Sequence, residues 1–197
     1  MWRSSSVSRR MPFLSPMRIR AVQRMIIVFT GKGKGKSTSA IGQGVRAIGQ
    51  GKKVLMIQFI KSKEFFSGED KAVKKFSRKF RLIKSGKGFV GIMGDKLSRN
   101  IHQKAAKKAL EKAKKAILSK KFDLIILDEV NVALSLRLIK LKDVLKVINL
   151  SLKGKDIILT GRGAGKELIK RADLATEFKE IKHPFKKGRV AKQGLEF

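Results

Sequence analysis

Glycines and lysines alternate in the stretch MIIVFTGKGKGKST at residues 25–38, directly after a short apolar run. Glycines in such a turn let backbone N–H groups converge on an anion, at the point where the next helix begins. Lys36 and Ser37 match the G-K-[ST] end of a phosphate-binding loop, where the lysine reaches phosphate oxygens and the hydroxyl binds magnesium. The usual G-x-x-x-x-G-K-[ST] pattern would place a glycine first, and this chain has a threonine there. We therefore predict a nucleotide phosphate site formed by Thr30, Gly31, Lys32, Gly33, Lys34, Gly35, Lys36, Ser37 and Thr38.

An acidic pair ends the apolar run FDLIILDE at residues 122–129. Such a strand is the expected second half of a nucleotide site, so we predict that Asp128 and Ser37 hold Mg²⁺, with Glu129 beside them. A second glycine-rich turn, in LTGRGAGKELI, places Arg162 just after another apolar run. We expect its guanidinium to reach a phosphate or a neighbouring acid. Together these motifs indicate a P-loop protein that binds a nucleotide such as ATP.

Strand-like and helix-like patterns alternate from Met25 onward, which indicates one domain over residues 25–197. Short, nearly continuous apolar runs predict strands that are buried on both faces, as in parallel sheets. These runs occupy residues 25–30, 52–60, 122–129 and 156–161. The pattern predicts an α/β fold of the RecA-like P-loop NTPase type, with a mainly parallel β-sheet sandwiched by helices.

The helices expected between these strands follow from apolar residues at helical spacing. We predict helices over residues 37–48 and 98–120, the second with a lysine-rich outer face. Gly154 stands where a later helix would be expected to end with a glycine cap. Residues 62–95 are poorly periodic and are expected to be mostly loop, with one strand at FRLIK. The apolar stripe of the later helix consists of Leu138, Leu141, Leu145 and Ile148.

Charge is the most unusual global property, because 48 lysines and arginines against 15 acids give a formal net charge of +33. This balance is compatible with a nucleic-acid partner. However, the chain shows neither aromatic stacking platforms nor a nucleic-acid-binding module, which makes that partner the less favoured interpretation and a lysine-rich solvated surface the better one. The absence of cysteine excludes disulfides, thiolate catalysis and cysteine-bound zinc. No apolar run is long enough for a membrane span, and we expect a soluble, cytoplasmic protein.

The first 24 residues differ in composition from the rest, with six arginines, no lysine and no acid. A serine- and arginine-rich, acid-poor segment resembles an organellar transit peptide, and upstream sequence read from a misplaced start is the alternative. Its few apolar residues show no sustained period, so burial could not offset the entropy of ordering it. We expect a disordered or dispensable tail ahead of the domain.

Three segments of the chain resemble the P-loop type of ATP:corrinoid adenosyltransferase. They read IIVFTGKGKGKSTSAIGQGVRAIGQGKKVLMIQFIK, LIILDEVNVAL and TGRGAGKELIKRADLATEFKEIKHPFKKGRVAKQGLEF, in this order. The resemblance implies transfer of the 5′-deoxyadenosyl group from ATP to Co(I) of a corrinoid, with release of triphosphate, in adenosylcobalamin biosynthesis or salvage. The phosphate chain would leave whole, cut at its ribose end. The resemblance also implies a homodimer and a reductase or flavin as electron donor.

The same resemblance assigns roles to single residues. Catalytic roles would fall to Lys36, Phe89 and Arg162. Glu129 would also belong to the binding site, as would His183 and Phe185 in the segment KHPF, which lie near the active site in the family.

Two features depart from the family pattern. Its G-F-x-W stretch, whose aromatic side chains crowd the lower face of the corrinoid, reads GFVG here and has Gly91 in place of the tryptophan. We expect that Met93, Phe65 or Phe66 fills this space, or that the reduction step works differently. The N-terminal tail also shows no match to the helix that covers the partner subunit's site in some relatives.

Two other functions fit the phosphate loop. A RecA-like ATPase stimulated by nucleic acid would explain the basic charge, and a nucleotide-binding assembly factor would need no catalysis at all. The identity of the corrinoid and of the electron donor stays open at this level.

Overall fold

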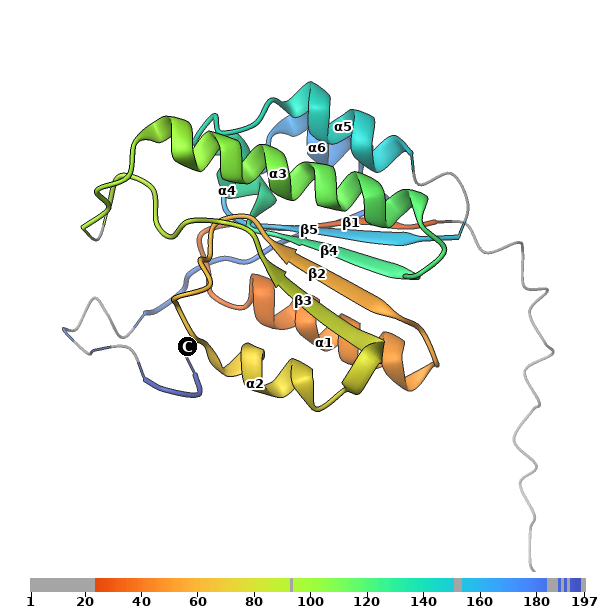
Figure 1. Ribbon diagram of the computed structural model, residues 1–197. Helices are drawn as coiled ribbons and strands as arrows, with labels where there is room; N and C mark the ends of the chain where they lie inside the picture. The colour runs from red at the N-terminus through yellow and green to blue at the C-terminus, as the bar shows by residue number, and fades with distance from the viewer. Residues whose placement is uncertain are drawn as a thin grey trace, which may run out of the picture.

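The computed structural model describes residues 24–92, 94–150, 154–183, 188, 190 and 192–195. Six parallel strands form one sheet in the order β3-β2-β4-β5-β1-β6, and helices cover both of its faces (Figure 1). This arrangement confirms the predicted α/β fold. The strands are β1 (Ile26–Thr30), β2 (Val54–Gln58), β3 (Phe80–Lys84), β4 (Leu124–Asp128), β5 (Asp156–Thr160) and β6 (Leu174–Glu177).

The helices divide between the two faces of the sheet (Figure 1). On one face lie α1 (Lys36–Gly49) and α2 (Gly68–Lys74), followed by a short 3-10 turn at Ser77–Lys79. The other face is covered by α3 (Arg99–Leu118), α4 (Val130–Ser135), α5 (Leu141–Asn149) and α6 (Lys166–Arg171). Each face has its own hydrophobic core, so the sheet is buried from both sides.

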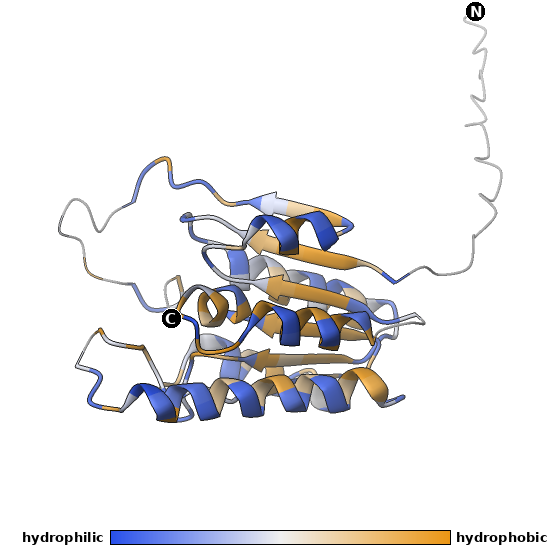
Figure 2. Cartoon of the chain, turned by 90° about the horizontal axis from the view of Figure 1, so that it is seen from above, coloured by the Kyte–Doolittle hydropathy of each residue, from blue (hydrophilic) through white to orange (hydrophobic). Residues whose placement is uncertain are grey.

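The central strands are apolar because they have no solvent-facing side. Every residue of β2 and of β4 is buried, as expected for a parallel sheet between helices. Figure 2 shows the strands as mostly hydrophobic, whereas α3 alternates between hydrophobic and hydrophilic residues. Helix α3 packs a row of alanines on the sheet and turns its lysines outward, which confirms the predicted amphipathic helix.

Three local features differ from the sequence predictions. The region expected to be mostly loop contains α2, which begins with a capping box between Ser67 and Asp70. The cap of α5 is Leu150 rather than Gly154, although Gly154 does adopt a left-handed backbone with a φ of 71°. Strand β6 was not predicted, because it is only four residues long, mixes polar and apolar residues, and is exposed. Among the described helices, none has both the length and the apolar character needed to cross a membrane.

Parallel strands bring all their carboxyl ends to one edge of the sheet. The loop after β1, the acidic end of β4 and the arginine turn after β5 therefore meet there, and β1 and β4 are separated only by β5. This edge is where α/β folds bind ligands.

Candidate functional site

The loop between β1 and α1 is the basis of the site. Lys36 is the first residue of α1 and is almost buried, with 7% of its surface exposed, and its Nζ donates a hydrogen bond to the carbonyl of Gly33 at 2.5 Å. Burial lowers the pKa of Lys36, and so does the nearby Arg162, while the carboxylate of Glu129 acts in the opposite direction. A buried ammonium at a helix N-terminus is suited to bind phosphate oxygens.

The glycines of this loop leave space for another part of the chain. A Cβ atom on Gly31 would lie 2.4 Å from the carbonyl oxygen of Phe178, and one on Gly33 would lie 2.7 Å from the backbone of Lys179. The Gly33 N–H donates to the Phe178 carbonyl at 2.7 Å, and the Phe178 N–H donates to the carbonyl of Thr30 at 2.8 Å. The loop is therefore held by the segment that follows β6.

Thr30, which stands in place of the usual glycine, makes a structural contact through its side chain. Its hydroxyl oxygen accepts a hydrogen bond from the N–H of Ala164 at 3.1 Å. Ala164 lies two residues after Arg162, so this bond ties the phosphate loop to the turn that carries the arginine.

Asp128 is the centre of a buried polar network below the loop. Its Oδ1 accepts hydrogen bonds from the hydroxyls of Ser37 at 2.6 Å and Thr160 at 2.7 Å. Its Oδ2 accepts one from Nε2 of Gln58 at 3.0 Å, and the exposed fraction of Asp128 is 0%. Gln58 and Thr160 were missed from the sequence, although each is a polar residue that ends a strand directly after a run of apolar residues.

The donor set around Asp128 fits Mg²⁺. The described residues contain no group of three or more histidine, cysteine, aspartate or glutamate side chains that could hold a metal. Magnesium does not need one, since it takes few protein oxygens and keeps water and substrate phosphates as its other ligands. The Ser37 hydroxyl and the Asp128 carboxylate supply such oxygens, and the buried Oε1 of Gln58 has no hydrogen-bond partner among the described residues.

Glu129 lies where the polar network meets the open part of the site. Its backbone has a φ of 61°, an uncommon value for a residue other than glycine, and its N–H donates to the Thr160 hydroxyl at 3.0 Å. Burial raises the pKa of its carboxyl to about 7, and the charge of Asp128 adds to the effect. The cations Lys36, Lys61 and Arg162 act against this shift.

A polar pocket opens above the phosphate loop. Its wall is formed by the loop, by charged side chains from other elements, and by three residues of the C-terminal segment. We call it the polar pocket, and its volume is about 330 Å³. It is lined by residues 32–38 together with Ile41, Lys61, Glu69, Glu129, Arg162, Glu180, His183 and Leu195.

A second pocket, of about 370 Å³, lies next to it and is mainly apolar. The ring of Phe65 meets the ring of Phe89 edge to face, with centroids 6.4 Å apart. Lys61, Glu129 and Arg162 line both pockets, so these three side chains form a shared wall. We call this second cavity the apolar pocket, lined by Ile60, Lys61, Ser62, Phe65, Gly88, Phe89, Ile92, Glu129, Val132 and Arg162.

Most of the predicted site residues come together at these pockets. Lys32 to Thr38, Glu129, Arg162 and His183 line the polar pocket, and Phe89 lines the apolar one. Asp128 lies beneath the loop, whereas Thr30 and Gly31 precede the part that lines the pocket. Phe185 lies outside the described residues.

Of the residues expected to fill the space of the missing tryptophan, Phe65 and Phe66 lie in different places. Phe65 lines the apolar pocket, while Phe66 does not and instead places its ring 5.8 Å from Nζ of Lys84. Met93 lies outside the described residues. Gly91 itself has a φ of 69°, a backbone conformation that a tryptophan would rarely adopt. Glycine at position 91 therefore suits the backbone conformation of this loop.

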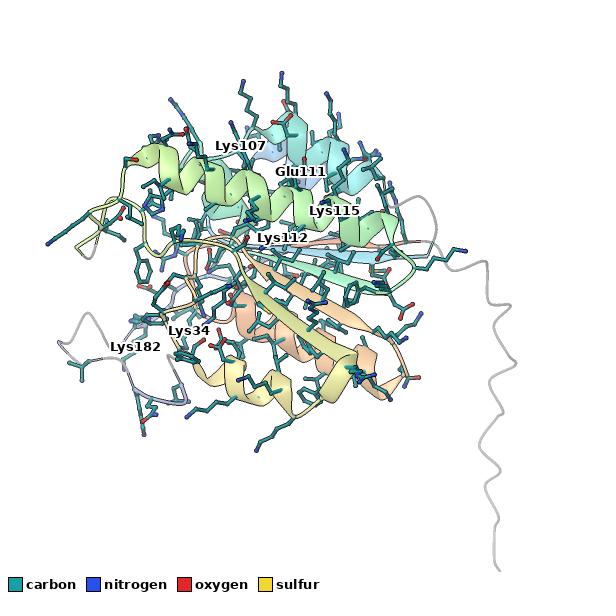
Figure 3. All side chains as sticks on the ribbon, in the orientation of Figure 1. Lys34, Lys107, Glu111, Lys112, Lys115 and Lys182 are labelled. Carbon is teal, nitrogen blue, oxygen red and sulfur yellow. The ribbon has the colours of Figure 1, made fainter. Side chains whose placement is uncertain are left out.

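Several wall residues were not recognised from the sequence. Lys61 follows the second apolar run and forms an ion pair with Glu69 of α2. Glu180 belongs to the C-terminal segment, as does Leu195, whose carbonyl accepts a hydrogen bond from Lys34. Figure 3 shows Lys34 and Lys182 at the same end of the molecule, and Lys107 and Lys115 on α3 away from it. Only proximity in the fold relates these wall residues to the loop.

A family model and the individual relatives of this chain indicate the same family. The family model described as "ATP:corrinoid adenosyltransferase BtuR/CobO/CobP" matches residues 22–197. A corrinoid adenosyltransferase of Sinorhizobium sp is 40% identical over 178 residues, which cover 88% of this chain and 80% of the relative. That of Pseudomonas aeruginosa is 36% identical and that of Escherichia coli (strain K12) 31%, each over 173 residues; both alignments cover 88% of this chain, and 83% and 85% of the relatives.

A solved structure supports the fold independently. The flagellar accessory protein FlaH from Methanocaldococcus jannaschii superimposes with a TM-score of 0.51 at 13% sequence identity. The match covers 78% of this chain and 70% of FlaH. At this level of identity the likeness concerns the fold alone.

Proposed function

Since the chain belongs to the ATP:corrinoid adenosyltransferase family, which transfers the adenosyl group of ATP to the cobalt of a corrinoid, we propose that the two adjacent pockets hold the two substrates. The polar pocket takes the triphosphate of ATP, and the apolar pocket takes one face of the corrinoid ring. The ribose then spans the shared wall, which brings its 5′ carbon towards the cobalt.

The shared wall of Lys61, Glu129 and Arg162 is the observation that carries this proposal. An ordinary P-loop hydrolase needs only a phosphate site and a water molecule at its γ end. Here an apolar cavity with two phenylalanines adjoins the phosphate site, and this suits a large flat co-substrate better than water.

The chemistry requires positioning more than proton transfer. The electron pair of Co(I) forms the new bond to the 5′ carbon of the ribose, and the carbon–oxygen bond breaks with its electron pair passing to the triphosphate. No proton is removed from the attacking atom, so the step needs no general base. We propose that Lys36 and Arg162 stabilise the charge on the leaving triphosphate.

Ser37 and Asp128 would hold Mg²⁺, which when bound neutralises part of the phosphate charge. Gln58 and Thr160 orient the Asp128 carboxylate through their hydrogen bonds. The Phe65–Phe89 pair would exclude water from the lower face of the corrinoid, in place of the aromatic residue absent at position 91.

Family resemblance supports three further proposals. We infer a homodimer, a reductase or flavin that supplies electrons to the corrinoid, and a location in the cytoplasm. The mass in solution tests the homodimer, and a monomer would contradict it. Adenosylation driven by a purified flavoprotein tests the electron donor, and an inert flavoprotein would contradict it. Cell fractionation tests the location, and recovery in the membrane fraction would contradict it.

The transfer is tested by incubating the protein with MgATP and chemically reduced corrinoid, and then identifying both products. We expect triphosphate together with the absorption spectrum of a cobalt–carbon bond. Lys36→Ala should lower kcat/KM by about 10²–10³-fold, because one charged contact with the leaving group is lost. Lys115→Ala, on the outer face of α3, is the matched control and should retain activity. Orthophosphate as the product, or no product, would overturn the proposal.

A further inference from the structure

The loop of residues 88–92 and 94–97 forms part of the apolar pocket and is joined to the domain near its start. Val90 packs against the hydrophobic core, and the N–H of Gly88 donates to the carbonyl of Ile60 at 2.9 Å. Gly88, Gly91 and Gly94 all have positive φ values, and a Cβ atom added to any of them would meet nothing within 4 Å. Phe89 and Ile92, which line the pocket, are 45% and 59% exposed. Packing therefore holds the loop at Val90, whereas the stretch around Gly91 and Gly94 needs another restraint.

Asp95 supplies the missing restraint. Its Oδ2 accepts a hydrogen bond from the N–H of Gly91 at 2.8 Å, and its Oδ1 accepts one from the N–H of Leu97 at 3.0 Å. These N–H groups, that of Gly91 first, hold the pKa of Asp95 below its usual range, so the carboxylate is charged at neutral pH. One side chain thus ties together two points of the loop.

His102 connects this carboxylate to the body of the protein. It lies in the first turn of α3 and is 3% exposed, and its Nε2 is 3.0 Å from Oδ2 of Asp95. The start of α3 is also held independently, because the Arg99 guanidinium donates to the carbonyl of Leu136. Loss of the link between Asp95 and His102 should therefore release the loop and leave the helix in place.

We propose that Asp95 and His102 are positioning residues that hold loop 88–97, so that Phe89 and Ile92 form the wall of the apolar pocket. The proposal rests on the proposed function in one respect, namely that this pocket binds the corrinoid. Neither residue needs to touch a substrate. By keeping a glycine-rich loop in one conformation, the pair preserves the shape of the corrinoid site and lowers the entropy that is lost when corrinoid binds.

The test compares Asp95→Asn and His102→Leu with the wild type, and uses Glu111→Gln on the exposed face of α3 as the matched control. Asparagine lacks one of the two carboxylate acceptors, and leucine removes the donor to Asp95. We expect the KM for corrinoid to rise about tenfold, as for loss of a charged hydrogen bond, and the KM for ATP to change less than about twofold. His102→Gln keeps an N–H donor and should restore part of the effect.

Amide hydrogen exchange provides a readout that does not depend on activity. Exchange at residues 88–92 and 94 should accelerate in Asp95→Asn and His102→Leu and stay unchanged in Glu111→Gln, with α3 still protected in all of them. Unchanged loop exchange would overturn the proposal even if the enzyme is active. Accelerated exchange without a change in the KM for corrinoid would show that the restraint on the loop does not affect substrate binding, and would also overturn the proposal. Absence of adenosylation in the wild type would instead refute the proposed function.

Discussion

Glu129 shows at the residue scale how one position in the site balances opposing charges. Its carboxyl is buried next to Asp128, and three cations surround it. The net effect raises its pKa to about 7, so at neutral pH it is partly protonated. A triphosphate bound nearby would therefore face less negative charge from this residue than an ordinary glutamate would impose.

The stability of the protein should report this balance. A raised carboxyl pKa means that the folded protein binds the proton more tightly than the unfolded chain, so stability is lost as pH rises from about 4.5 to about 7. Glu129→Gln cannot ionise and should escape this loss. Without nucleotide, we expect its free energy of unfolding relative to wild type to improve by about 2–3 kcal/mol between pH 5 and pH 8.

Urea unfolding at the two pH values measures the difference. Glu111→Gln, which changes an exposed acid of α3, is the matched control. An equal effect of Glu129→Gln at pH 5 and pH 8 would mean that folding does not raise the pKa of this carboxyl.

At the scale of elements, the phosphate loop depends on a strand far away in the sequence. Strand β6 pairs with β1 at the edge of the sheet, and the chain that leaves it crosses the loop at Phe178 and Lys179. Phe178 also meets Phe29 of β1 edge to face, with ring centroids 5.7 Å apart. Close packing thus requires glycine at positions 31 and 33, in addition to the phosphate binding that we propose for this loop.

Gly33→Ala tests this packing directly. The new methyl group would overlap the backbone of Lys179, which cannot move as easily as a side-chain end, so we expect a loss of about 1–3 kcal/mol in unfolding free energy. Gly42→Ala in α1 is the matched control, because its methyl group would meet nothing within 4 Å. There the helix should gain about 0.5–1 kcal/mol.

Thermal or urea unfolding of both variants gives the comparison, and ATP binding by each shows whether the loop is also disturbed. Equal stability of Gly33→Ala and the wild type would show that the segment after β6 does not pack closely on the loop.

At the scale of the whole molecule, the net charge of +33 is carried largely outside the site. Most lysines of α3 are exposed, and Lys107 and Lys115 lie on its outer side (Figure 3). Lys36, Lys61 and Arg162, in contrast, are gathered around the shared wall and the phosphate loop. The basic surface and the basic site are therefore separate features, and the family relationship accounts for the second.

The described contacts of the domain begin at Arg24. Its guanidinium donates to the Ile148 carbonyl, and the N–H groups of Met25 and Ile26 donate to Asp156 and Asp173. We predict that a chain beginning at Met25 folds and keeps adenosylation activity, with a Tm within about 4 °C of the full chain. Circular dichroism and the product assay measure both. A chain that fails to fold would show that the first 24 residues belong to the domain.

The sequence by itself determined the phosphate loop, the four apolar strands and the family, because each depends on residues close together in the chain. A run such as LIILDE identifies both a buried strand and its acidic end, wherever the strand lies in the sheet. The capping box of α2 was also legible locally, although the prediction overlooked it. Strand β6 gave no such signal, since all four of its residues are exposed.

Only the tertiary structure decided which side chains surround the loop. Gln58 and Thr160 reach the site because they end the two strands beside β4, and Lys61 reaches it because it follows β2. Strand order cannot be inferred from local patterns. The same holds for the shared wall between the two pockets and for the link from Asp95 to His102. Local preferences fix the elements, whereas long-range packing of the sheet fixes which ends meet.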